Sequence, residues 1–276
     1  MNLNPSNEKV ALLTFATGKY NSLLKLSSPL MKIYAELWGF SYFELKESLD
    51  LKRPISWSKL LAIENLLQKY EVVIYLDVDV MILKMDENIL EDFDKRYDFA
   101  WRVSSISGKL SPNAGVMLFR SSVATKSLLR CAYEQTDLIY DGWWEQAALI
   151  RVLGYSDPRP SSVEKLANAP LVTVRERKLM PKWNSVALEA GSGQANFRHF
   201  AGEPFSVRRL MMIEYLLYHH SANSKVKKMI SIEQLVEEYQ LISKEIHGLY
   251  SKKRDRFFFR GKSVLSKLKI RKIRYY

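Results

Sequence analysis

One stretch, residues 72–82, constrains this chain more than any other: an apolar run reaches two carboxylates and then resumes as apolar. Its first five residues are apolar and mostly β-branched, which predicts a strand buried on both faces of a parallel α/β sheet. Asp77 and Asp79 follow two residues apart, so extended backbone would point both side chains the same way. Open α/β sheets bind ligands beyond the carboxyl ends of their strands, and paired carboxylates there suit Mg²⁺ or Mn²⁺. Taken alone, the motif fits equally well a strand end whose Asp side chains cap the next turn.

The composition indicates a globular protein. The chain has 276 residues, of which 47% are hydrophobic and 26% charged, enough for one large α/β domain or one domain with an appendage. The single cysteine, Cys131, excludes an internal disulfide framework and fits a reducing compartment. The first residues are polar and resemble no signal peptide, and no stretch approaches the roughly 18 apolar residues of a membrane span. We therefore expect a soluble, cytoplasmic protein.

The net charge of +12 comes almost entirely from residues 251–276. This segment holds eleven Lys and Arg against one acid, Asp255, and so carries +10, which leaves +2 for residues 1–250. Large apolar residues, including Phe257 and Tyr276, interleave with the basic ones. Such a composition suits an anionic membrane surface, although disorder and RNA binding are alternatives. Because the rest of the chain is nearly neutral, no nucleic acid partner is expected for it.

Strands and helices alternate through the first part of the chain. A strand from residue 9 runs into a small-residue turn, a helix opens at Ser28-Pro29 and ends at Gly39, and a strand at 40–45 precedes a helix from Trp57. Further on, we predict a short helix at 86–93, strands at 97–101, 112–120 and 171–174, and helices at 121–135, 141–149, 207–219 and 231–247. The alternation predicts a doubly wound, mostly parallel sheet with helices on both faces.

Candidate donor-binding residues follow the first strands. Thr14 and Ala16 end the first strand, and with Tyr20 they could frame a base and ribose, although a plain turn is as good an interpretation. The dinucleotide fingerprint with three glycines is absent here. Lys59, at a helix start, could bind phosphate as a point charge or be a solvated lysine. With Asp77 and Val78, these residues make up the predicted donor site.

Candidate catalytic residues come later. Asn113 precedes the small pair Ala114-Gly115, which would let the backbone approach a ligand closely. Glu145 and Gln146 lie in a first helical turn for which Asp141 is the expected N-cap; acids favoured there by the helix dipole are the alternative. His199, a lone histidine after apolar residues, would be a structural residue unless the fold brings it beside Asp79.

The ordered set of these motifs resembles a known family. The matching segments are residues 14–17, 34–40, 57–60, 75–80, 113–116, 144–149 and 199–202. They resemble, in the same order, motifs of the GT-A family of retaining, metal-dependent glycosyltransferases that includes fungal mannan and galactomannan α-glycosyltransferases and plant xyloglucan xylosyltransferases. The resemblance implies a UDP-sugar donor and Mn²⁺ or Mg²⁺ held by Asp77, Asp79 and His199. It also implies that Asn113 and the Glu145-Gln146 pair face the transferred sugar or the acceptor.

Two departures from the family pattern matter. The usual Asp-Gln pair is Glu145-Gln146 here, which adds a methylene near the sugar, and the usual N-terminal membrane anchor is missing. We therefore expect a cytoplasmic relative, peripheral on the inner face of the membrane, that transfers a hexose or pentose to a glycan or lipid-linked acceptor. The expected organisation is a catalytic domain at 1–205, packed helices at 206–250 and a basic aromatic tail at 251–276.

Three alternatives remain open at this point. An inverting GT-A transferase would use Glu145 as a general base. A nucleotidyltransferase also uses paired carboxylates and metal but typically has a glycine-rich basic loop after its first strand, which this sequence lacks. A basic adaptor that binds membrane or nucleic acid through its tail would be no enzyme at all.

Overall fold

The computed structural model describes residues 8–106, 109–156, 170–186, 195–220, 228 and 230–250. The strands are β1 Val10–Phe15, β2 Ser41–Leu45, β3 Val72–Asp77, β4 Val80–Ile82, β5 Phe99–Ile106, β6 Lys109–Arg120, β7 Glu176–Lys178, β8 Ser185–Val186 and β9 Phe197–His199. The α-helices are α1 Asn21–Trp38, α2 Ser58–Leu66, α3 Val123–Tyr133, α4 Trp144–Val152, α5 Phe205–His220 and α7 Ile232–Tyr250. Short 3₁₀ turns are η1 Gly18–Tyr20, η2 Ile55–Trp57, η3 Ile89–Asp92, η4 Thr136–Leu138 and η5 Pro181–Trp183.

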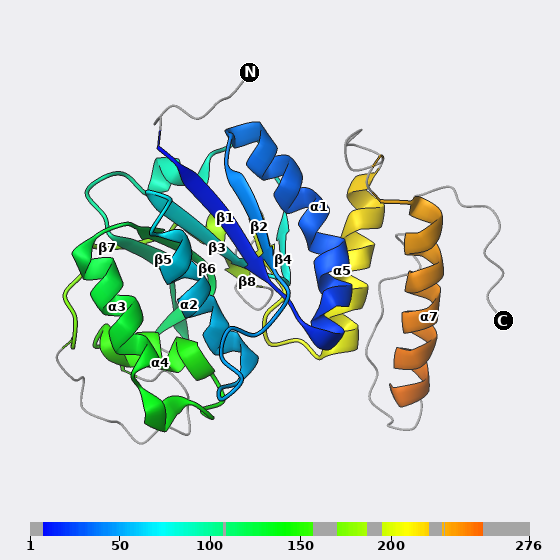
Figure 1. The fold of residues 1–276 in the computed structure, drawn as a ribbon. Helices are drawn as coiled ribbons and strands as arrows, with labels where there is room; N and C mark the ends of the chain where they lie inside the picture. Colours follow the sequence, from blue (N-terminus) through cyan, green and yellow to red (C-terminus); the bar gives the residue numbers. More distant parts are fainter. Residues whose placement is uncertain are drawn as a thin grey trace.

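A six-stranded sheet in the order β2-β1-β3-β6-β5-β7 forms the centre of the fold (Figure 1). Five strands run in one direction and β6 runs against them, because both pairings of β6 are antiparallel. Alternate residues of β3 enter opposite cores: Ile74 belongs to the core that includes residues of α1, α5 and α7, whereas Tyr75 belongs to the core that includes residues of α2, α3 and α4. The predicted α/β class, mostly parallel sheet and two helical layers are thus confirmed.

The composition of residues 72–82 suggested one strand, but the structure divides this stretch into two. β3 ends at Asp77, and a turn through Val78 and Asp79 carries the chain out of the main sheet. β4 then pairs with β9 in a separate small sheet of order β4-β9-β8. The residues on both sides of the two aspartates are apolar and buried, so composition alone hides the break.

Several predicted elements differ from the structure. The short helix predicted at 86–93 is only the 3₁₀ turn η3. α1 begins at Asn21 rather than at Ser28-Pro29: Pro29 lies inside the helix, and buried leucines at 23, 24 and 26 extend the apolar face across it. A proline there removes one intrahelical hydrogen bond, which the buried face offsets. The predicted strand at 171–174 is irregular, and β7 forms only at Glu176–Lys178. α4 begins at Trp144, and Asp141 instead accepts a 2.8 Å hydrogen bond from the backbone N–H of Trp143.

The C-terminal helix α5 packs on α1, and α7 packs on α5 (Figure 1). An ion pair between Arg209 and Glu238 and a 3.0 Å hydrogen bond from Tyr239 to Glu214 join α5 to α7. Ser231 caps α7, accepting a hydrogen bond from the backbone N–H of Gln234 at 3.3 Å. None of the helices that the structure describes is both long and apolar enough to cross a membrane.

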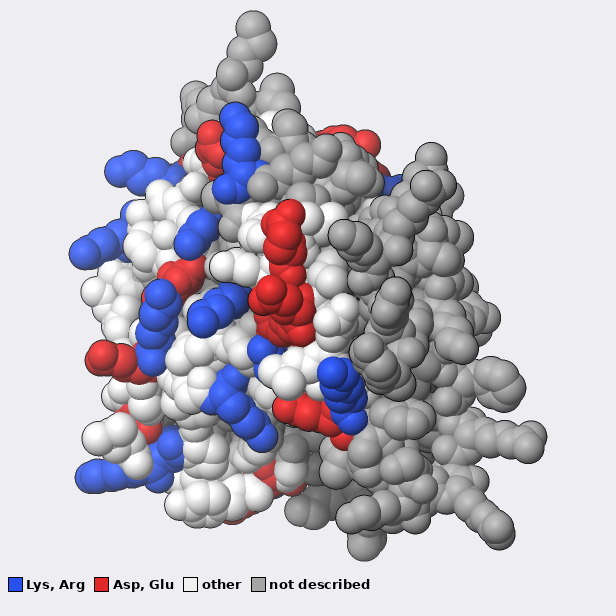
Figure 2. Space-filling model, turned by 90° about the vertical axis from the view of Figure 1, so that its right-hand side faces the viewer, with Lys and Arg blue, Asp and Glu red and all other residues white. Residues whose placement is uncertain are grey.

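Acidic side chains gather near the middle of the face that α7 presents, with Lys and Arg side chains around them (Figure 2). The exposed residues of α7 include Glu233, Glu237 and Glu245. The described part of this face is therefore not a basic patch. The predicted membrane contact at 251–276 lies outside the described residues.

Candidate functional site

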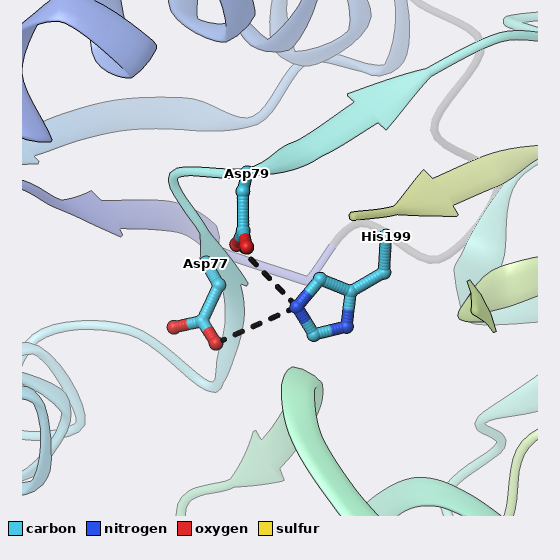
Figure 3. Close-up of side chains that lie close together, drawn as sticks. All are labelled: Asp77, Asp79 and His199. Carbon is cyan, nitrogen blue, oxygen red and sulfur yellow. Dashed lines mark ion pairs between the residues drawn. The ribbon is translucent and has the colours of Figure 1, made fainter. Parts of the chain in front are cut away.

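The turn between β3 and β4 places two carboxylates beside one imidazole (Figure 3). β4 pairs antiparallel with β9, and this register sets Val80 opposite His199. His199 Nε2 therefore lies 3.4 Å from Asp79 Oδ1 and 3.9 Å from Asp77 Oδ2. One ligand atom from each of Asp77, Asp79 and His199 lies within 4.8 Å of the others. The carboxylates converge through a turn, not through the extended backbone that the two-residue spacing suggested.

The opposite side of the imidazole is held by two asparagines. His199 Nδ1 lies 3.0 Å from Asn184 Oδ1, and Asn184 Nδ2 donates to Asn113 Oδ1 at 2.8 Å. The same oxygen of Asn113 accepts a 2.9 Å hydrogen bond from the backbone N–H of Gly115. Asn184 and His199 are buried, with 0% and 3% of their surface exposed. Asn113, expected to face the sugar, thus uses its carbonyl oxygen to support this network.

Gly115 gives the imidazole its room. A Cβ on this residue would lie 2.0 Å from His199 Cε1 and 2.4 Å from Nδ1. The glycine lies where the register of β5 and β6 shifts, since Trp101 pairs with Met117 but Arg102 pairs with Asn113. Such bulges bend a strand and re-aim backbone near functional sites. The group that this glycine approaches closely is the His199 ring, whereas the sequence suggested a ligand.

Lys59 joins the metal-site carboxylates to the predicted catalytic pair. Its ammonium lies 3.0 Å from Asp77 Oδ1 and 2.7 Å from Glu145 Oε1, and Tyr75 donates to Asp77 Oδ1 at 2.8 Å. Burial alone would lower the pKa of Lys59, but the two carboxylates raise it well above its usual value. The ammonium expected to bind phosphate is therefore charged and held between carboxylates.

Glu145 and Gln146 enter the site from the first turn of α4. Glu145 is 3% exposed, and its Oε2 has no hydrogen-bond partner among the described residues. Gln146 Oε1 accepts from the backbone N–H of Ala114 at 2.9 Å, which ties α4 to β6. Trp144, immediately before them, has φ 46°, and no other non-glycine residue in the described ranges has a positive φ. Strained backbone of this kind concentrates at functional sites.

Arg208, which sequence reasoning missed, reaches the site from α5. One of its guanidinium nitrogens lies 2.8 Å from Asp79 Oδ2. Burial alone would raise the pKa of Asp79, but His199 in its protonated form and the guanidinium of Arg208 together lower it to about 2. Asn184 was missed as well, because its sequence context is unremarkable and only its tertiary contacts distinguish it. Tyr75 lies in the matching segment 75–80, but its hydroxyl was not assigned a role.

The residues predicted to hold the nucleoside divide into two groups. Thr14 lies near the end of β1 and Ala16 directly follows the strand, beside β3, where Phe15 pairs with Asp77. Thr14 is fully buried, and its hydroxyl has no partner in the part of the chain that the structure describes. Tyr20 lies in η1, with its ring edge-on to Phe205 at a centroid distance of 5.6 Å. Tyr20 therefore contacts the start of the helix that carries Arg208.

Comparisons with known proteins support the same fold. A glycosyltransferase involved in the glycosylation of the major capsid of PBCV-1 is 16% identical, with a TM-score of 0.57 over 74% of this chain and 98% of that one. The bifunctional glycosyltransferase WbbM is 11% identical, with a TM-score of 0.52 over 86% of this chain and 52% of that one. GlyE of Streptococcus pneumoniae TIGR4 is 12% identical, with a TM-score of 0.51 over 83% and 64% respectively. No curated protein matches the sequence.

The sequence itself matches a family over most of its length. The match covers residues 20–191 and includes the Asp77–Asp79 turn, Lys59, Asn113, Glu145 and Asn184. The paired carboxylates at the carboxyl end of β3 and the GT-A-like fold agree with it. The chain belongs to the nucleotide-diphospho-sugar transferase family and is a glycosyltransferase of GT-A type.

Proposed function

We propose that the protein transfers a hexose or pentose from a UDP-sugar to a glycan or lipid-linked acceptor, with retention of configuration, and depends on Mn²⁺ or Mg²⁺. The observation that carries the proposal is the convergence of Asp77, Asp79 and His199 at the carboxyl end of β3. We also propose that the protein is related to the retaining fungal and plant transferases that its motifs resemble.

The residues present fit a divalent cation. Two carboxylate oxygens and one imidazole nitrogen form a donor set that Mn²⁺ accepts. Asp79 and His199 are buried, whereas the Asp77 side chain is 28% exposed, which leaves a side open to substrate. When bound, the cation would neutralise charge on the diphosphate that leaves the sugar.

The contacts of Glu145 favour retention over inversion. An inverting enzyme needs a general base that takes a proton from the acceptor. Glu145 is buried and its Oε1 is held by the ammonium of Lys59 at 2.7 Å, which fixes the carboxylate in place instead of leaving it free to carry a proton away. A fixed negative charge suits the stabilisation of an oxocarbenium-like sugar. In the proposed same-face reaction, an oxygen of the leaving diphosphate takes the acceptor proton, and Glu145 or Gln146 stabilises the cationic sugar.

Donor-induced thermal stabilisation tests the metal site. UDP with Mn²⁺ should raise the unfolding temperature of the wild-type protein more than UDP with EDTA, because a ligand of the folded state stabilises it. Asp79→Ala should abolish the Mn²⁺-dependent increment, whereas Asp86→Ala, which removes an exposed acid outside the metal-ligand group, should retain it. If Asp79→Ala retained the full increment, the metal assignment would be wrong. The anomeric configuration of the product, read by NMR, distinguishes retention from inversion.

Residues 251–276 carry a second part of the proposal. Their eleven basic residues and interleaved aromatics suit an anionic membrane surface, where a lipid-linked acceptor would be found. Full-length protein should co-sediment with anionic liposomes at low salt and dissociate at high salt. Deletion of 251–276 should abolish co-sedimentation while hydrolysis of soluble donor continues. Full-length protein left in the supernatant at low salt would contradict the membrane contact.

A further inference from the structure

A chain of hydrogen bonds that begins at a backbone N–H determines the orientation of two side-chain amides. The N–H of Gly115 can only donate, so the atom of Asn113 that it meets at 2.9 Å must be the carbonyl oxygen. Asn184 approaches that same oxygen at 2.8 Å and must present its NH₂ group. The carbonyl oxygen of Asn184 then faces Nδ1 of His199 at 3.0 Å. Neither side-chain amide, that of Asn113 or that of Asn184, can be flipped without placing two donors or two acceptors in contact.

The imidazole tautomer follows from this orientation. Nδ1 faces an acceptor and must carry a hydrogen, so in the neutral ring Nε2 carries the lone pair. Nε2 faces the oxygens of Asp79 and Asp77 at 3.4 and 3.9 Å. Three groups that accept hydrogen bonds thus converge on one point. A cation between them satisfies all three, whereas the opposite tautomer would place a proton there.

We propose that Asn184, supported by Asn113, is a positioning residue that selects the Nδ1–H tautomer of His199 and so presents Nε2 to the divalent cation. The tautomer stands on the hydrogen bonds alone, and only the cation rests on the proposed function. Asn184 is fully buried and His199 nearly so, so solvent cannot readily replace the amide. Partners of this kind orient metal-binding histidines and change metal affinity when they are removed.

Nitrogen NMR of ¹⁵N-histidine-labelled, full-length protein tests the tautomer directly, in EDTA at pH 9. The signals of His199 are assigned by their loss in His199→Gln. The wild-type protein should show a neutral ring with hydrogen on Nδ1. Asn184→Leu, which keeps the size but removes the hydrogen bonds, should move the hydrogen to Nε2, where Asp79 can accept it. A wild-type ring with hydrogen on Nε2, or an Asn184→Leu ring unchanged from wild type, would overturn the proposal.

Mn²⁺ binding, followed by electron paramagnetic resonance of the free ion, tests the consequence. Asn184→Leu should weaken Mn²⁺ binding by about 10–100-fold. Asn184→Asp should keep hydrogen on Nδ1 and weaken Mn²⁺ binding less than Asn184→Leu does, because its carboxylate still accepts that hydrogen even though the hydrogen bond to Asn113 is lost. Asn65→Leu, on the exposed side of α2, should leave Mn²⁺ binding unchanged.

If Asn184→Leu does not fold, Asn184→Asp still tests the tautomer of His199. Hydrogen on Nε2 in Asn184→Asp would also refute the proposal. If Asn184→Leu and Asn184→Asp weakened Mn²⁺ binding equally, packing and not the hydrogen bond would be responsible, and the proposal would be refuted. Wild-type protein with the Nδ1–H tautomer but no Mn²⁺ affinity would refute the proposed metal-dependent function and leave the positioning role of Asn184 intact.

Discussion

Gly115→Ala would test whether the bulge in β6 exists to make room for the His199 ring. The added Cβ would lie 2.0 Å from Cε1 of His199, whereas ordinary contacts begin at 3.4 Å. The ring or β6 must therefore move by about 1.4 Å, the difference between these distances. Metal–ligand distances tolerate only about ±0.2 Å, so Nε2 would leave the shared position. We expect Mn²⁺ affinity to fall by about 100-fold, the upper end of the range for lost supporting contacts.

A double-mutant cycle separates this clash from a general effect on β6. Gly115 does not lie in the positive-φ region that disfavours alanine, so backbone strain does not enter. Gly115→Ala should lower the free energy of unfolding in the wild-type background, measured in urea, and much less in the His199→Ala background, where the ring is gone. Equal losses in the two backgrounds, or unchanged Mn²⁺ affinity of Gly115→Ala, would refute the steric argument.

Three further outcomes are expected. Lys59→Met leaves the carboxylate of Glu145 buried without its cation. The free energy of unfolding, measured by urea denaturation, should fall by about 3–5 kcal/mol. A loss below about 1 kcal/mol would show that the pair is not buried in solution. Hydrogen bonds from Arg175 lower the pKa of Asp98 to about 2; the stability they provide should be complete above about pH 4 and lost as the pH falls towards 2. Asp98→Asn should flatten that part of the stability–pH curve. Tyr20→Ala should weaken UDP and UDP-sugar equally in titration calorimetry, because stacking acts on the base; an unchanged UDP affinity would remove Tyr20 from the nucleoside site.

The parts of the fold predicted from the sequence are those that depend on local signals. The apolar, β-branched run before Asp77 identified the central strand, and Gly39, with φ 71°, ends α1 as a left-handed C-cap. The start of α1 was missed because Pro29 is an ambiguous signal: it fits a first helical turn as well as an interior position. The turn at Val78 was missed because burial continues through it.

The site was predictable only as far as it resembles a family. Asp77 and Asp79 form a local motif, but His199 lies far along the chain and reaches them through the pairing of β4 with β9. Short strands of three residues leave almost no periodic signal. Arg208 and Asn184 contribute through single contacts whose partners are distant in sequence. No propensity or spacing identifies such residues, because the information lies in tertiary geometry.

The balance of charge around Asp79 has a consequence for the order in which ligands bind. Asp77, Asp79 and Glu145 bring three negative charges, and Lys59 and Arg208 bring two positive ones. With a neutral imidazole the site carries one net negative charge, which a single divalent cation reverses. A nucleotide diphosphate should therefore bind much better once the cation is present. Linkage then requires the nucleotide to tighten the cation by the same factor, so we expect the two to bind cooperatively, each weakly when alone.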